Sequence, residues 1–333
     1  MDKSTPPDNL EARFLEPEGF RWHSFTRENR TIRFGSVFPK DSIPDAVVVC
    51  LPGLSEYGEK YFELAHDILK ANLAFWVIDW MGQGASSRYL KNNFKRHSDN
   101  FEHDVQDLHK LVMEYIKHSS VHPDKGRIPL AMLGHSMGSN IGLRYLAEYP
   151  DHFECAAFSA PLLGIHNVSG YFEPGLLGLA KTLSTLIGTS YGPGQIDWHE
   201  NMRPYSDHDK FSSDEQRGKI HEAWLKKNPD LQIGGVTYQW IYDALRSCKA
   251  AKKALSSITT EILVGIAEND VIVSNSCIQK SFASLQTAKV ITLENSQHEI
   301  LMERDEIRSN FLNEFYALIE KNIIMKPETL RPF

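Results

Sequence analysis

The sequence predicts an α/β fold: a doubly wound, mostly parallel sheet with a helical cap inserted after the sixth strand. Three observations predict it: short apolar runs, segments of helical spacing between them, and one long stretch that breaks this alternation. Continuous apolar runs suit strands that are buried on both faces of a parallel sheet. Strands that alternate with helices indicate a doubly wound arrangement. A chain of 333 residues buries enough apolar surface to build such a core.

The individual elements follow from local patterns. Residues 20–38 mix aromatic, β-branched and polar side chains around a turn at Glu28-Asn29, which predicts an antiparallel hairpin at a sheet edge. Apolar residues recur three or four positions apart from Tyr61 to Ile68 and from Val105 to Ile116, so both segments are expected to be helices. The expected buried strands are Ala46–Leu51, Leu73–Ile78, Ile128–Leu133, Cys155–Phe158 and Glu261–Gly265.

One stretch departs from the alternation of strands and helices. Residues 165–250 are rich in Gly, Pro and aromatic residues and contain no convincing buried strand. We expect them to form a cap over the carboxyl edge of the sheet. The predicted domain division is an N-terminal extension (1–19), an α/β core (20–164 and 251–325), the cap (165–250) and a C-terminal tail (326–333).

Composition argues against several functional classes. The formal net charge of −7 and the lack of a basic stripe argue against nucleic acid as a partner. The polar start lacks the apolar centre of a secretory signal, and no stretch approaches the roughly 18 apolar residues of a membrane span. We therefore expect a cytoplasmic protein. Its cysteines lie far apart and form no C-x-x-C pair, which predicts reduced, mostly buried thiols and no metal site: Cys50, Cys155, Cys248 and Cys277.

The string Gly134-His135-Ser136-Met137-Gly138 lies between an apolar run and a segment of helical spacing that Pro150 ends. A strand, a turn with Gly on both sides and a helix form a nucleophile elbow, in which the serine adopts a strained backbone and its Oγ points into solvent. Amide groups at the helix N-terminus also stabilise negative charge. Ser136 is therefore the candidate nucleophile, and the alternative is a Gly-rich packing turn without chemistry.

A serine hydroxyl needs a base to remove its proton, and that base needs a third group to orient it. In this fold the acid and then the histidine follow the serine along the chain. Asp270 lies in the loop after a buried strand, and Glu268 in the same loop is its competitor. His298 is the only histidine after this acid, and it follows the strand-like Val290–Leu293. We predict a triad of Ser136, Asp270 and His298, against the alternative that His298 is an exposed loop residue.

Acyl transfer also requires hydrogen-bond donors for the oxyanion, usually the amide after the nucleophile and one from an early strand-to-helix loop. The amide of Met137 follows the nucleophile. We expect the second donor in Leu51–Glu56, with Leu54 as the best candidate, because Gly53 lets the loop backbone approach a substrate. The alternative is that this segment is only the end of a strand.

With these residues in view, the chain resembles the monoacylglycerol lipase and bacterial lysophospholipase group of α/β-hydrolases, over roughly residues 20–320. The matching blocks are Gly134–Gly138, Pro52–Glu56 leading to Tyr61, Ile78–Ser86, and Ser296–Leu301 continued by Glu303, Asp305 and Arg308. The last block and the cap segment Asn228–Trp240 are most similar to the bacterial lysophospholipases. Two departures are Pro52, where the lipases usually carry His, and Trp80-Met81, which replaces a common His-Arg. The first counts against the monoacylglycerol alternative, and neither touches the triad.

The resemblance implies an α/β-hydrolase fold and a serine hydrolase without a cofactor. The implied reaction is cleavage of a carboxylic ester of a single-chain lipid, above all a lysophospholipid, through an acyl-enzyme on Ser136. The alternatives are a monoacylglycerol lipase, a small-ester carboxylesterase, and a non-catalytic binding module of the same fold. The sequence makes no prediction of oligomeric state.

A helix that begins near Pro174-Gly175 would carry an apolar stripe in the cap. This stripe either packs within the cap or forms a lid wall that faces an acyl chain. The stripe consists of Leu176, Leu179, Ala180, Leu183, Leu186 and Ile187. A further hypothesis is peripheral contact of the cap with the inner face of the cytoplasmic membrane, although the net negative charge opposes binding to anionic lipid.

Overall fold

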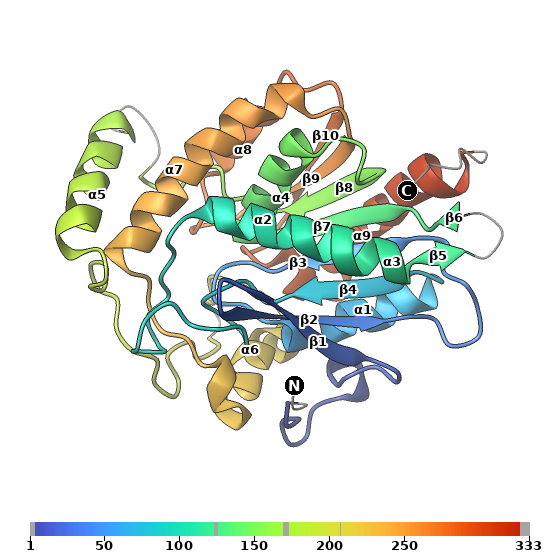
Figure 1. Ribbon diagram of the computed structural model, residues 1–333, viewed down its shortest axis with the longest axis horizontal. Helices are drawn as coiled ribbons and strands as arrows, with labels where there is room; N and C mark the ends of the chain where they lie inside the picture. The colour runs from blue at the N-terminus through green and yellow to red at the C-terminus, as the bar shows by residue number, and fades with distance from the viewer. Residues whose placement is uncertain (1–3, 123–125, 169–172, 207, 327–333) are drawn as a thin grey trace.

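The computed structural model describes residues 4–122, 126–168, 173–206 and 208–326 (Figure 1). Within these ranges an eight-stranded sheet forms the centre, in the order β1-β2-β4-β3-β7-β8-β9-β10. The six strands from β4 to β10 in this order run parallel to one another, whereas β2 is antiparallel to both of its neighbours. The sheet is therefore mostly parallel, as the sequence predicts.

The first two strands form the predicted edge hairpin. β1 (Arg21–Arg27) pairs with β2 (Arg30–Val37), and Arg27 lies opposite Arg30. Between them, Glu28 and Asn29 have φ angles of 48° and 66°. Two consecutive residues of positive φ form a tight turn whose twist matches that of the flanking strands, so the short loop sets the register of the hairpin.

Five of the six parallel strands coincide with the expected apolar runs, and β10, with mostly exposed or half-buried side chains, is the sixth. All side chains of the four strands at the centre of the sheet are buried, as continuous apolar runs require. The parallel strands are β3 (Val47–Leu51), β4 (Ala74–Ile78), β7 (Leu130–His135), β8 (Cys155–Ser159), β9 (Glu261–Ala267) and β10 (Ala288–Leu293). β5 (Val121–His122) and β6 (Gly126–Arg127) form a separate short pair.

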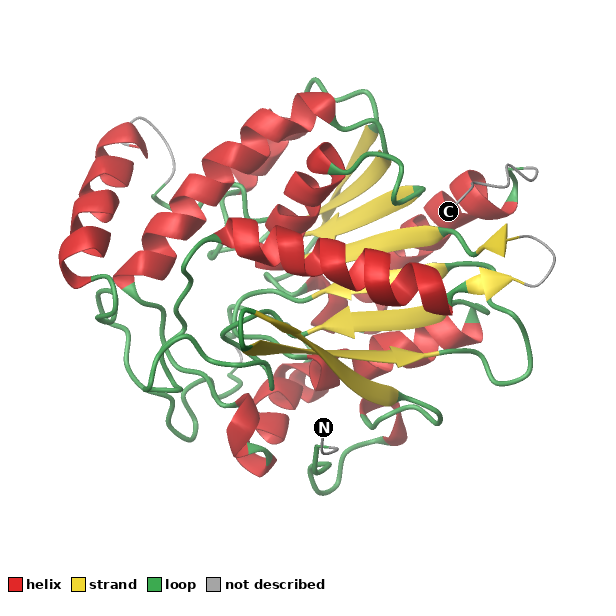
Figure 2. Cartoon of the chain, in the orientation of Figure 1, coloured by secondary structure: helices red, strands yellow, loops and turns green. Residues whose placement is uncertain are grey.

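Helices cover both faces of the sheet (Figure 2). On one face they share a core cluster with the sheet: α2 (Phe101–Lys110), α4 (Met137–Glu148), α7 (Tyr238–Ala254) and α8 (Asn275–Phe282). On the other face lie α1 (Phe62–Lys70), α6 (Glu215–Lys227) and α9 (Asp305–Ile319). A π-helical segment, Leu111–Ile116, continues α2 into α3 (Lys117–Ser119), and another, Glu320–Ile324, follows α9. Short 3-10 helices span Ala12–Phe14, Gly58–Tyr61, Pro229–Leu231, Leu255–Ser257 and Ile300–Met302.

The described residues between β8 and β9 form helices and loops but no strand of the sheet, as expected for the predicted cap. α5 (Glu173–Ile187) packs against α7. The expected boundary at residue 250 falls inside α7, and residues 327–333 of the expected tail lie outside the described ranges. The division into core and cap therefore stays a prediction. No described helix is both long and apolar enough to cross a membrane.

The predicted apolar stripe of the cap is divided in the structure. Ala180 is buried, whereas Leu179, Leu186 and Ile187 are 56%, 73% and 41% exposed. The stripe therefore packs only in part within the cap, and none of its residues lines the large cavity described below. The cysteines form no disulfide among the described residues, and all except the half-buried Cys277 are buried.

Candidate active site

Ser136 occupies a sharp turn between β7 and α4. Its φ and ψ are 49° and −114°, a conformation that costs energy for a residue with a Cβ. A Cβ on Gly138 would lie 2.1 Å from the carbonyl oxygen of Leu51, so only glycine lets α4 begin this close to the end of β3. The expectation that Oγ points into solvent is wrong: Ser136 is only 6% exposed, and it lines a cavity that residues of the predicted cap help to enclose.

Two further side chains reach Ser136 from distant loops. His298 Nε2 lies 3.0 Å from Ser136 Oγ, and His298 Nδ1 lies 2.7 Å from Asp270 Oδ2. The second carboxylate oxygen of Asp270 accepts hydrogen bonds from the amides of Ile272 and Val273, at 2.8 and 2.9 Å. Such a chain allows the histidine to take the serine proton while the carboxylate orients the ring and stabilises its positive charge.

The geometry favours Asp270 over Glu268 as the acid. Burial favours the neutral form of Asp270, but the hydrogen bond and charge of His298 and the two backbone amides hold the pKa of this carboxyl below its usual range. Glu268 is exposed, and its carboxylate accepts a hydrogen bond from the amide of Asn295 at 2.8 Å. Among the described contacts, it is therefore Asp270 that holds the ring of His298.

The two amides expected to stabilise an oxyanion are available. Among the described residues neither the amide of Leu54 nor that of Met137 donates a hydrogen bond to an acceptor of the protein. Met137 is the first residue of α4, and its amide therefore lies at the positive end of the helix. Both Leu54 and Ser136 line the same cavity. Both amides are therefore unpaired, as donors to an oxyanion must be, and their role in acyl transfer stays a prediction.

Two side chains that follow β4 hold the loop that carries Leu54. Trp80 Nε1 donates to the carbonyl of Pro52 at 2.8 Å. Gln83 Nε2 donates to the carbonyls of Gly53 and Glu56 at 2.7 and 2.8 Å, and Gln83 Oε1 accepts from the amide of Ser55 at 3.1 Å. The motif Ile78–Ser86 therefore positions the loop, a role that sequence reasoning did not assign to it.

A buried charge cluster lies beside the candidate triad. Lys60 Nζ is 2.7 Å from a carboxylate oxygen of Glu56 and 2.7 Å from one of Glu299, and Arg203 Nη2 is 2.9 Å from the other oxygen of Glu299. Burial opposes ionisation of Glu299, but Arg203 and Lys60 hold its pKa well below the usual range. Burial also lowers the pKa of His135 to about 4, so this ring is neutral near pH 7.

The same cluster resembles a metal site at first sight. Ligand atoms of Glu56, His135 and Glu299 lie within 4.8 Å of one another. However, the Lys60 ammonium contacts both carboxylates and already supplies positive charge there. The donor set is therefore better explained as an ion-pair cluster than as a metal centre.

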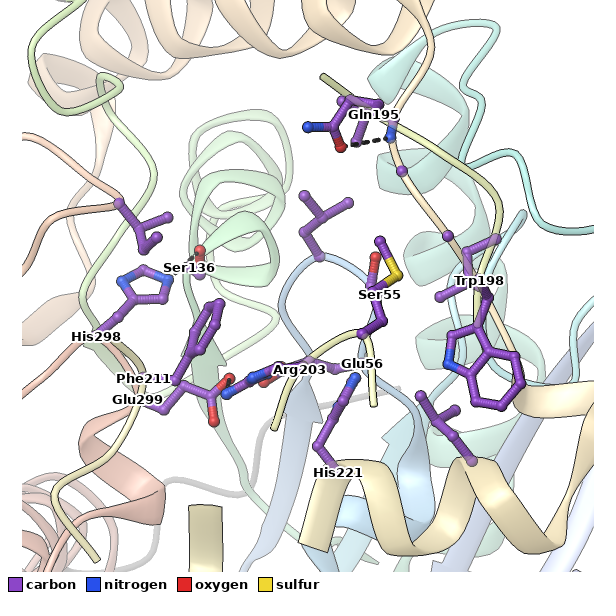
Figure 3. A pocket seen from close by; sticks show the side chains of 18 of the residues that line it. Ser55, Glu56, Ser136, Gln195, Trp198, Arg203, Phe211, His221, His298 and Glu299 are labelled. Atoms are coloured by element: carbon purple, nitrogen blue, oxygen red, sulfur yellow. Dashed lines mark hydrogen bonds and ion pairs between the residues drawn. The ribbon is translucent and has the colours of Figure 1, made fainter. Parts of the chain in front are cut away.

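The triad opens into a cavity of about 380 Å³ (Figure 3). Ser136 and His298 lie on one side of the cavity and Trp198 on the other, with Arg203 and His221 between them. Many of the lining side chains are apolar: Leu54, Leu162, Ile165, Met202, Leu225, Ile233, Val236 and Ile272. The polar lining comes largely from the predicted cap and from the charge cluster.

The structure brings together all five residues that the sequence nominated: Ser136, Asp270, His298, Leu54 and Met137. Sequence reasoning missed the roles of Gln83 and Glu56, although both lie in motifs that it had singled out. It also missed Lys60, Glu299 and the cap residues Arg203, His221 and Glu222. No sequence signal was available for Arg203, which lies in an irregular loop without periodicity. His221 and Glu222 lie on α6, and helical spacing alone does not tell which side chains of a helix reach a cavity.

The chain is similar in sequence and in fold to several known proteins. The probable lysophospholipase L2 of Haemophilus influenzae is 26% identical over 289 residues, covering 86% of this chain and 87% of that protein. Lysophospholipase L2 of Escherichia coli K12 is 27% identical over 274 residues, covering 80% and 77%. A soluble variant of monoglyceride lipase from Saccharomyces cerevisiae has a similar fold, with a TM-score of 0.71, 16% identity, and coverage of 95% of this chain and all of that chain. The family model described as serine aminopeptidase, S33, matches residues 42–305, and the chain therefore belongs to this α/β-hydrolase family.

Proposed function

We propose that the protein is a serine hydrolase that cleaves the carboxylic ester of a single-chain lipid, with a lysophospholipid as its substrate. The observation that carries the proposal is the 3.0 Å contact between Ser136 Oγ and His298 Nε2 at a largely apolar cavity. An apolar cavity suits an acyl chain, and an activated serine at its wall suits attack on the ester. The family membership and the names of the two bacterial relatives support the same reaction.

The proposed reaction uses the candidate triad and the two unpaired amides. His298 takes the proton of Ser136 as Oγ attacks the ester carbonyl carbon, and Asp270 stabilises the resulting imidazolium. The amides of Leu54 and Met137 donate to the oxyanion. When the intermediate collapses, the C–O bond breaks and His298 returns the proton to the glycerol oxygen, which leaves as the alcohol. His298 then deprotonates a water molecule that attacks the acyl-enzyme, and the fatty acid leaves as Ser136 regains its proton.

The test compares fatty-acid release from lysophosphatidylcholine, a monoacylglycerol of the same chain and a short-chain ester, with Ser136→Ala as the blank. We expect the fastest release from the lysophospholipid. Preference for the monoacylglycerol or for the short ester would mean that the substrate is one of these alternatives and not a lysophospholipid. The monoacylglycerol is included because a monoglyceride lipase has a similar fold. Activity no greater than the blank on every ester would contradict the enzymatic function and favour a non-catalytic binding module of the same fold.

We also propose that the enzyme works in the cytoplasm and reaches its substrate at the membrane surface through the cap, residues 165–250. Leu179, Leu186 and Ile187 of α5 are exposed, and apolar side chains on one helix favour insertion at a lipid interface. Sedimentation with neutral phosphatidylcholine vesicles tests this contact. We expect Leu179→Glu combined with Leu186→Glu to abolish sedimentation, and unchanged binding of this variant would contradict the role of α5.

A further inference from the structure

Several polar side chains of the cap line the cavity without a protein partner for one of their atoms. Among the described residues, Trp198 Nε1, Arg203 Nε, His221 Nδ1 and Glu222 Oε2 have no hydrogen-bond partner. His221 and Glu222 are only 7% and 8% exposed. Because buried polar atoms are normally paired, these four side chains together indicate a place for a polar ligand rather than for an acyl chain.

The charges around this part of the cavity are unequal. Three carboxylates line it, those of Glu56, Glu222 and Glu299. Lys60 and Arg203 pair with Glu56 and Glu299, whereas no described cation pairs with the carboxylate of Glu222. Burial lowers the pKa of His221 well below its usual value, so this ring adds no positive charge near pH 7. Among the described residues that line the cavity there is therefore one guanidinium, which Arg203 shares with Glu299, and one carboxylate without a counter-ion.

We propose that Trp198, Arg203, His221 and Glu222 bind the head group of a zwitterionic lysophospholipid, an inference that rests on the proposed function. The phosphodiester contacts the guanidinium of Arg203, and the ammonium lies between Glu222 and the indole of Trp198. A carboxylate and an indole ring both attract an ammonium. A guanidinium donates to phosphate oxygens in a planar, charge-assisted arrangement.

The surroundings of Arg203 prepare it for this contact. Its guanidinium carbon lies 3.3 Å from the centre of the Phe211 ring, which holds the plane of the group. Nη2 forms an ion pair with Glu299, and among the described residues neither Nη2 nor Nε has a hydrogen-bond partner. Glu299 directly follows His298, so the phosphate position lies next to the candidate base. The short glycerol spacer of a lysophospholipid then places its ester at Ser136.

The experiment measures kcat/KM for three lipids with the same acyl chain: lysophosphatidylcholine, lysophosphatidylglycerol and monoacylglycerol. The variants are Glu222→Gln and Arg203→Gln, and the control is Glu200→Gln, an exposed cap residue. We expect Glu222→Gln to lower kcat/KM for lysophosphatidylcholine, relative to kcat/KM for lysophosphatidylglycerol, by about tenfold, because it removes the partner of the ammonium. Arg203→Gln should lower kcat/KM for lysophosphatidylcholine, relative to kcat/KM for monoacylglycerol, by about tenfold. The control should change neither ratio.

Ratios cancel any loss of folded protein, so an unstable variant still gives a result. Unchanged ratios in both variants, with a wild type that cleaves lysophospholipids, would overturn the head-group site and leave the proposed function intact. A wild type that releases no more fatty acid than Ser136→Ala from any lipid would overturn both.

Discussion

Replacing Gln83 by alanine should damage catalysis without touching the triad. Gln83 is fully buried, and its amide makes three hydrogen bonds of 2.7, 2.8 and 3.1 Å to the loop that carries Leu54. It also accepts a hydrogen bond from Arg96 Nε at 2.9 Å. Alanine removes the three hydrogen bonds that Gln83 makes to this loop, so the carbonyls of Gly53 and Glu56 lose the side-chain amide that donates to both of them.

The magnitude follows from these contacts. Each buried hydrogen bond contributes about 1 kcal/mol net, so the free energy of unfolding should fall by about 3–4 kcal/mol. If the amide of Leu54 moves away from the oxyanion position, kcat should fall by about 10²-fold or more, the effect of losing one such donor. KM should change by less than about threefold, because the donor acts mainly on the transition state.

The assay combines kcat and KM for a short soluble ester with thermal unfolding. The matched control is Asn322→Ala, since Asn322 is also a buried amide and donates to Glu261 and Leu318, at 3.2 and 3.1 Å, at the end of α9. We expect the control to lose stability and to keep its kcat. A folded Gln83→Ala enzyme with a kcat within threefold of the wild type would refute the reasoning.

Three further outcomes are expected. In Asp270→Asn the side-chain oxygen should keep its hydrogen bonds from the two backbone amides, so the new NH2 group faces His298 and forces the wrong tautomer of the ring. We expect kcat to fall about 10³–10⁴-fold with little change in Tm, and a fall in kcat of less than tenfold would contradict this. Gly138→Ala places a Cβ 2.1 Å from the carbonyl oxygen of Leu51. Urea unfolding should therefore show a free energy of unfolding that is lower by more than about 3 kcal/mol, whereas a stability equal to that of the wild type would show that α4 can shift. Burial raises the pKa of Asp104 to about 7, so the folded state binds this proton more tightly and stability falls as pH rises from about 4 to 7. Asp104→Asn should remove that fall, and identical pH profiles of unfolding would argue against it.

Much of the fold could be predicted because each buried parallel strand is an uninterrupted apolar run. The five candidate site residues could also be predicted, since each follows the end of a parallel strand, and the carboxyl ends of parallel strands meet at one edge of a sheet. The apolar stripe of α5 shows where this reasoning stops. Its spacing predicts one face, but the packing against α7 leaves Leu179 and Leu186 in solvent.

The sequence by itself determined where the candidate triad lies along the chain: an elbow at Ser136, an acid after β9 and His298 after β10. These positions depend on local backbone preferences, which neighbouring residues impose. Only the tertiary structure decided that Asp270 rather than Glu268 reaches the histidine, that Gln83 supports the loop of Leu54, and that Arg203 enters the cavity. Such contacts join segments far apart in the chain, and the direction of each side chain depends on how those segments pack together.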